Sequence, residues 1–164
     1  MNGGPRHPRS EASDSIGVRA SALAQRLRSL SKEDPDKLYA LGYVLYNHPE
    51  RSRNQALQKE TEEVLQRVLV RDPYHAWARM YLGYNAYDLG RYDAARQHFL
   101  DADSSQLTPN FALSRKEMIL ASDLRNGDIS ENLASFEKYV AEAERAESVD
   151  VFPMSLAKTL EDLH

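Results

Sequence analysis

The stretch DPYHAWARMYLGYNAYDLGRYDAARQHFLDADSSQ, residues 72–106, decides the fold of this chain. It opens on Asp72-Pro73, where a carboxylate can cap a helix and proline can take the first helical position, at which its missing N–H costs nothing. Gly90 is expected to end this first helix, because glycine adopts a left-handed turn without steric cost. Asp93 can then cap a second helix that runs to about Ser104. The stretch therefore predicts a helix–turn–helix unit.

The same start signal recurs on both sides of this unit. Asp34-Pro35 stands 38 residues before Asp72-Pro73, and Thr108-Pro109 stands 36 residues after it. Each start opens a further predicted pair of helices, which gives three units over approximately residues 34–73, 74–108 and 109–147. Amphipathic helices are also predicted at residues 15–31 and 153–163, and strand signals are nearly absent. We expect an all-α chain of eight helices.

Small and aromatic residues follow a fixed order in the middle unit: Leu82-Gly83, Gly90, Tyr92, Ala95, Phe99 and Ala102. This order resembles the tetratricopeptide (TPR) repeat family, whose 34-residue pattern has Leu-Gly in the first helix, Gly at the turn, and Ala, an aromatic residue and Ala in the second. Gly83 and Ala95 would let the two helices approach closely, and Phe99 would fill the space one turn further on.

The resemblance is strong in the middle unit and partial in the other two. Arg79 and Leu107 depart from the usual large apolar residue and proline of the family. The first unit keeps Leu41-Gly42, but its inter-helix loop is about seven residues longer than the family pattern. The third unit keeps Gly127 and Phe136. The resemblance implies stacked TPR-like repeats, about three in number, with capping helices at both ends.

The domain prediction is a single helical domain over residues 15–164 after a basic tail at residues 1–14. Beyond Met1 the tail holds no large apolar side chain to anchor it, so we expect it to be disordered. The first predicted helix carries apolar residues at spacings of four and three, namely Ile16, Ala20, Leu23, Leu27 and Leu30. We expect this stripe to pack on the first unit, and the alternative is a homodimer through residues 16–30.

The resemblance also implies a binding groove, because the first helix of each pair lines the concave side of such a stack. The groove positions of the first two units hold Asp36 and seven predicted site residues: Tyr39, Tyr43, Tyr46, Trp77, Met80, Tyr84 and Tyr87. Tyrosine and tryptophan are typical interface anchors. Leucine stripes such as Leu38 and Leu41 already provide packing faces, so we expect the aromatic face to bind an apolar segment. The alternative is that these aromatic residues pack between neighbouring helices.

Several other function classes have no support in the sequence. The absence of cysteine excludes thiolate chemistry, and a net charge of −4 argues against nucleic-acid binding. The chain has no phosphate-binding glycine loop and no His-Glu-x-x-His metal motif, and its five histidines are scattered. We expect no enzyme activity, no cofactor and no metal. With no long apolar run and no secretory leader, we expect no membrane span and a cytoplasmic location.

The function expected from the sequence is a protein-binding or peptide-binding TPR module, a scaffold or adaptor. One alternative is a dedicated chaperone for a secreted partner, because the overall layout is similar to TPR-type bacterial secretion chaperones, in which an N-terminal helix contributes to a homodimer. A second alternative is an inhibitor or immunity protein. It would bind a basic partner through residues 128–164, which hold nine acidic and three basic residues.

Overall fold

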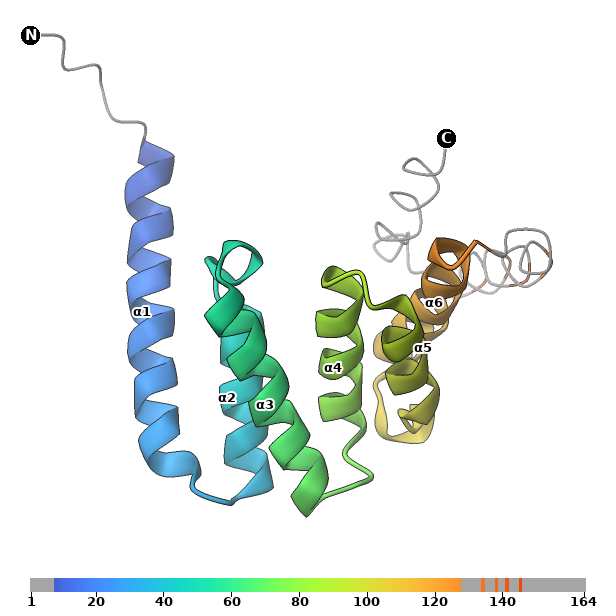
Figure 1. The fold of residues 1–164 in the computed structure, drawn as a ribbon, viewed down its shortest axis with the longest axis horizontal. Coiled ribbons are helices and arrows are strands. Elements are labelled where there is room, and N and C mark those ends of the chain that lie inside the picture. The colour runs from blue at the N-terminus through green and yellow to red at the C-terminus, as the bar shows by residue number, and fades with distance from the viewer. Residues whose placement is uncertain (1–7, 128–133, 135–137, 139–140, 142–144, 146–164) are drawn as a thin grey trace, which may run out of the picture. The chain divides into compact units, whose positions relative to one another are not determined.

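The computed structural model describes residues 8–127 and four isolated positions, 134, 138, 141 and 145. Six α-helices and two short 3-10 helices form within these residues, and they contain no strand, so the described chain is all-α (Figure 1). Contacts divide the chain into two compact units, Met1–Pro73 and Tyr74–His164, where the sequence predicts one domain. The helices predicted after Gly127 lie outside the described residues.

The first unit is a helical hairpin with a long helix packed beside it. Helix α1 (Pro8–Ser31) packs along α2 (Pro35–Tyr46), and α2 pairs with α3 (Gln55–Arg71) after the short helix η1 (Arg51–Arg53) (Figure 1). The Asp34 carboxylate caps α2 as predicted, because it accepts from the backbone N–H groups of residues 36 and 37 at 3.0 and 3.3 Å. Asn54 caps α3 in the same way.

Helix α1 begins earlier than predicted. It starts at Pro8, so the part of the predicted disordered tail that the structure describes is helical. Proline is well suited to a first helical turn, where no N–H partner is needed. The following residues include Arg9, Glu11 and Ala12, which are good helix formers, and a helix nucleated downstream extends through such residues at low cost. Residues 1–7 lie outside the described part of the chain.

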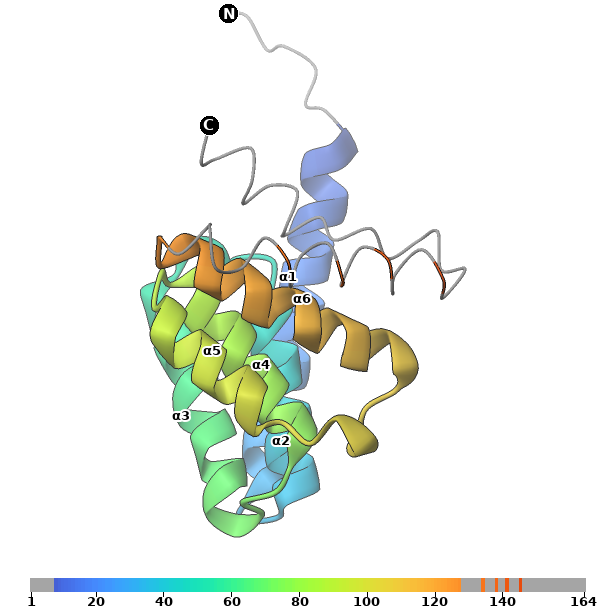
Figure 2. The same cartoon turned by 90° about the vertical axis from the view of Figure 1, so that its right-hand side faces the viewer.

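The described part of the second unit contains α4 (Ala76–Asp88), α5 (Tyr92–Asp101) and α6 (Pro109–Arg125), with the short helix η2 (Ser104–Gln106) before α6 (Figure 2). The predicted cap at Asp72-Pro73 is wrong. His75 caps α4, since its Nδ1 accepts from the N–H of Ala78 at 3.1 Å. Pro73 lies in a turn three residues before the helix, which leaves Asp72 at the end of α3.

The predicted turn glycines and the third start signal are confirmed, with one change at α5. Gly90 and Gly127 have φ angles of +71° and +93°, which glycine adopts without strain. Helix α6 begins at Pro109, as predicted. Asp93 is not the cap of α5, because the helix already begins at Tyr92. Its carboxylate instead accepts from the side-chain amide of Asn126 at 2.8 Å, which ties the start of α5 to the end of α6.

Each of the two described hairpins contains a close contact between a glycine and a large side chain of the other helix. In α4–α5, a Cβ added to the buried Gly83 would lie 2.6–2.8 Å from three ring atoms of Phe99. In α2–α3, a Cβ added to Gly42 would lie 2.5 Å from Cδ2 of Leu65. The predicted close approach at Gly83 is therefore confirmed. The glycine and its partner are 16 residues apart in α4–α5 and 23 apart in α2–α3, so the longer loop of the first unit accounts for the difference of seven.

Candidate functional site

The predicted site residues of α4 pack inside the second unit. The ring of Trp77 meets Phe111 of α6 edge-on, with centroids 4.6 Å apart. Tyr87 meets Tyr92 of α5 in a similar arrangement at 5.2 Å. Met80 is 0% exposed and belongs to the core between these helices, which corrects its assignment to an open groove. The helix is covered on two sides because α5 packs on its leucine–glycine face and α6 packs on part of its aromatic face.

Tyr84 is also held within this unit. Its ring lies edge-on to Phe99 with centroids 5.3 Å apart, and its hydroxyl and the Ser114 hydroxyl share a hydrogen bond of 3.0 Å. Burial raises the pKa of the Tyr84 phenol above its ordinary value, because the charged phenolate would lose its hydration. The described contacts of Tyr84 are therefore those of a residue that packs between helices, the alternative that the sequence left open.

The three predicted tyrosines of α2 differ from one another. Tyr46 lies under the guanidinium of Arg51, whose Cζ is 4.1 Å from the ring centroid and whose Nε donates to the Tyr46 carbonyl at 2.7 Å. Tyr39 is half-buried, its ring centroid is 6.4 Å from that of Tyr43, and burial is the main reason why its pKa rises to about 12. Tyr43 is 45% exposed. Of the three, Tyr43 is thus the most exposed.

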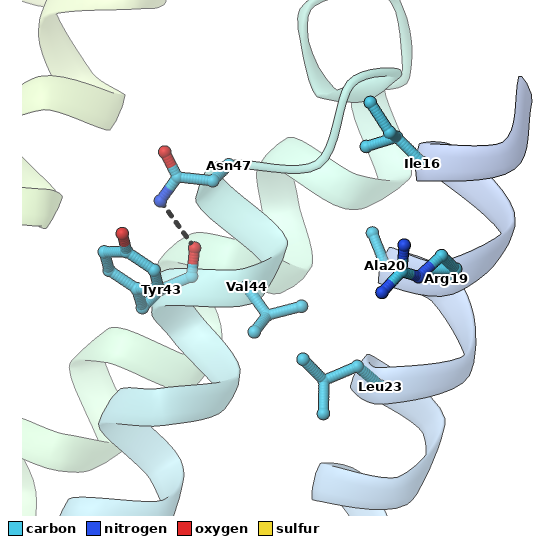
Figure 3. Close-up of a pocket in the computed structure, with 7 residues that line it drawn as sticks. All are labelled: Ile16, Arg19, Ala20, Leu23, Tyr43, Val44 and Asn47. Atoms are coloured by element: carbon cyan, nitrogen blue, oxygen red, sulfur yellow. Dashed lines mark hydrogen bonds between the residues drawn. The ribbon is translucent and has the colours of Figure 1, made fainter. Parts of the chain in front are cut away.

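Tyr43 lines an apolar groove between α1 and α2, with a volume of about 470 Å³. Figure 3 shows Ile16, Ala20 and Leu23 extending from α1 toward α2, and Val44 extending from α2 toward α1. The remaining lining residues are Arg19 and Asn47, and the amide of Asn47 donates to the Tyr43 carbonyl at 2.9 Å. We call this cavity the α1/α2 groove. An open cavity with such a lining can hold apolar side chains.

The groove stays open because α1 packs on the hairpin through a different stripe from the one predicted. The residues that contact the hairpin or are buried against it are Gly17, Ser21, Ala24, Arg28 and Ser31, which we call the docked stripe. Gly17 and Ala24 are buried, and small side chains at these positions let α1 approach closely. The stripe predicted to pack lies one residue earlier along the helix, and Ile16 and Leu23 in it are 58% and 47% exposed. Leu30 of the same stripe is 52% exposed, so the prediction that the first unit covers this apolar stripe is wrong for these three residues.

Polar contacts fix α1 in this position. The N–H of Glu50 donates to Nδ1 of His48 at 3.2 Å, so the neutral ring carries its proton on Nε2 and can donate to the Ser21 hydroxyl at 2.9 Å. Further along, the guanidinium of Arg28 binds both carboxylate oxygens of Glu60 of α3, at 2.6 and 2.8 Å. These contacts hold α1 on the face next to the groove.

A second cavity, of about 300 Å³, lies on that docked side of α1 and has a different character. It is lined by Arg28, Lys32, Glu60, Glu63 and Arg67 together with Ser31, Leu41 and Val64. Arg28 is paired with Glu60, and Arg67 donates to the Lys32 carbonyl and to Glu33. Its charged groups thus hold the helices of the unit together.

The sequence predicted part of the α1/α2 groove. It singled out Ile16, Ala20 and Leu23 as a stripe and Tyr43 as a site residue, but it assigned them to separate surfaces. It missed Arg19, Val44 and Asn47. The sequence did contain a signal for the groove, namely the stripe of small residues next to the apolar stripe on α1. When the small residues pack on a neighbouring helix, the apolar stripe is left partly exposed.

Among the described residues, no group of three or more acidic or histidine side chains is arranged to hold a metal ion. None of their helices combines the length and the apolar character that crossing a bilayer requires.

The chain matches no known protein-family pattern, no curated protein and no solved structure. The resemblance to the tetratricopeptide repeat therefore remains a prediction from the sequence.

Proposed function

We propose that this chain is a protein-binding module of tetratricopeptide-like helical hairpins, which holds a segment of a partner protein. The equivalent close contacts of Gly42 with Leu65 and of Gly83 with Phe99 support the repeat assignment, because they place the Leu-Gly pair at the same kind of helix crossing in both hairpins. The helix order and the turn at Gly90 agree with it.

The observation that carries the binding function is the α1/α2 groove. Ile16 and Leu23 are about half exposed on the α1 side of it, and Val44 faces them from the α2 side (Figure 3). Large apolar side chains that gather in an open cavity favour binding, whereas isolated exposed apolar residues are ordinary. The proposed site thus keeps Tyr43 of the predicted set and moves away from Trp77 and Met80.

The narrower roles depend on which partner is bound. A chaperone for a secreted protein and a general adaptor would both use such a groove, and the identity of the partner separates them. The inhibitor alternative rests on residues 128–164, almost all of which lie outside the described part of the chain. We keep the general module as the proposal.

The test combines capture with matched variants. Proteins bound by the immobilised chain are identified by mass spectrometry, and each candidate is purified and its affinity measured by calorimetry. We expect Leu23→Ser to lower the affinity for a true partner by about tenfold or more, as truncation of a central apolar anchor does. Val18→Ser is the control, because Val18 is on the same helix, is 69% exposed and does not line the groove. A partner that is insensitive to Leu23→Ser, or equally sensitive to both variants, would contradict the proposed site.

A further inference from the structure

The apolar stripe of α1, which the hairpin covers only in part, has the spacing of a coiled-coil seam. Its residues, Ile16, Ala20, Leu23, Leu27 and Leu30, alternate spacings of four and three, as the two core positions of a heptad do. Residues 16–30 extend over about 20 Å of helix, at about 1.5 Å per residue. Ile16, Leu23 and Leu30 are each about half exposed. Such a seam matches another α-helix of about four turns.

The open flank of this stripe is positively charged. Arg19 and Arg26 lie seven residues apart, next to the apolar stripe on the side away from the docked stripe. Both are exposed, and no acidic side chain among the described residues forms an ion pair with either of them. Residues 15–31 contain no acidic residue at all. A helix that lies along this stripe would therefore meet Arg19 at the groove and Arg26 two turns further along.

A second copy of α1 fits this seam poorly. In an antiparallel pair the same flanks face each other, which would bring Arg19 and Arg26 of one copy against those of the other. In a parallel pair each arginine flank would face the opposite flank of the second helix. That flank is occupied, because Gly17 and Ala24 are already buried against the hairpin. Like-charge contact or steric conflict follows in either arrangement.

We propose that the α1/α2 groove binds an amphipathic helix of a partner protein whose apolar stripe is flanked by acidic residues. The inference rests on the proposed function and adds the chemistry of the partner. Apolar side chains of the helix enter between Leu23 and Val44, and its carboxylates meet Arg19 and Arg26. Burial of the apolar stripe supplies most of the affinity, and the arginines select partners by charge.

The test uses two synthetic peptides of three heptads with leucine at both core positions, one with glutamate and one with lysine at the flanking positions. Their affinities for the full chain are measured by fluorescence anisotropy, after circular dichroism has shown that each variant is folded. We expect the glutamate peptide to bind about tenfold more tightly than the lysine peptide, and we expect this difference to shrink when the ionic strength rises from about 0.05 M to about 0.5 M. Leu23→Ser should lower the affinity for the glutamate peptide by about tenfold, and Val18→Ser should leave this affinity unchanged.

A charge reversal gives an independent readout that removes no apolar contact. The double variant Arg19→Glu, Arg26→Glu should favour the lysine peptide, whereas Arg53→Glu, at an exposed position that does not line the groove, should keep the original preference. Equal affinity of the wild-type chain for both peptides would overturn the charge inference. So would a stable homodimer in light scattering that Leu23→Ser dissociates. If neither peptide binds while a captured partner still depends on Leu23, the inference fails and the proposed function stands. If no ligand depends on Leu23, both fail.

Discussion

Gly83 of α4 lies directly against the ring of Phe99 of α5, so that a Cβ at position 83 would stand 2.6 Å from Cε1 of the ring. Phe99 is fully buried and its ring has little room to move. Gly83→Leu should therefore lower the free energy of unfolding by about 1–3 kcal/mol through overpacking. Urea denaturation measures this change. A variant as stable as the parent chain would show that the two helices do not meet at this position.

Replacing Gly17 of α1 should raise stability, whereas replacing Gly83 should lower it. A Cβ there would have its nearest contact at 3.7 Å, with Cγ of Pro49, which is an ordinary van der Waals distance. Because alanine loses less backbone entropy than glycine inside a helix, Gly17→Ala should raise the free energy of unfolding by about 0.5–1 kcal/mol. A loss of stability in the same urea titration would mean that α1 lies closer to the hairpin than described.

Two tyrosines of the predicted site should respond differently to truncation. Tyr84→Ala removes a ring that packs on Phe99 and a hydroxyl bonded to Ser114, so it should cost about 3 kcal/mol of stability. Tyr43 is 45% exposed, and Tyr43→Ala should change stability by about 0.5 kcal/mol or less. Thermal unfolding of the two variants, monitored by circular dichroism, compares them directly. Equal losses would place Tyr43 in the core and remove it from the α1/α2 groove.

The raised pKa of Tyr39 gives stability a specific dependence on pH. Burial favours the neutral phenol in the folded chain and raises its pKa from 10.0 to about 12. Below about pH 10 the phenol is neutral in both states and this contribution is fully present. Between about pH 10 and pH 12 only the unfolded state ionises Tyr39, so stability falls as the pH rises. Urea denaturation across this range should show a shallower fall for Tyr39→Phe than for the parent chain. Tyr74→Phe, at a position that is 80% exposed, is the control and should follow the parent curve.

The sequence predicted those features of the fold that local chemistry determines. The cap at Asp34, the helix ends at Gly90 and Gly127 and the close contact at Gly83 depend on residues whose backbone or capping properties are specific. The start of α4 was missed because histidine is not among the preferred capping residues, and here His75, three residues after Asp72, accepts from the N–H of Ala78.

The candidate site was less predictable because it depends on which faces pack. The aromatic residues of α4 were assigned to a groove because the repeat pattern places them on the concave face. In the structure, α6 packs beside α4 and covers part of that face. In α1 two stripes at the same spacing compete for one neighbour. The smaller side chains of Gly17 and Ala24 allow the closer approach, and hydrophobicity alone ranks the stripes in the opposite order.

The α1/α2 groove should be open in the free chain and covered when a ligand binds. Because the chain has no cysteine, single thiols can report this directly. Leu23→Cys probes the groove, Val18→Cys an exposed position outside it, and Ala24→Cys the buried face of the same helix. The measurement is the rate of thiol labelling of each variant, alone and with saturating glutamate peptide. We predict fast labelling at positions 18 and 23 in the free chain, slow labelling at position 24, and protection by the peptide at position 23 alone. Slow labelling at position 23 in the free chain, or equal protection at positions 18 and 23, would contradict the account.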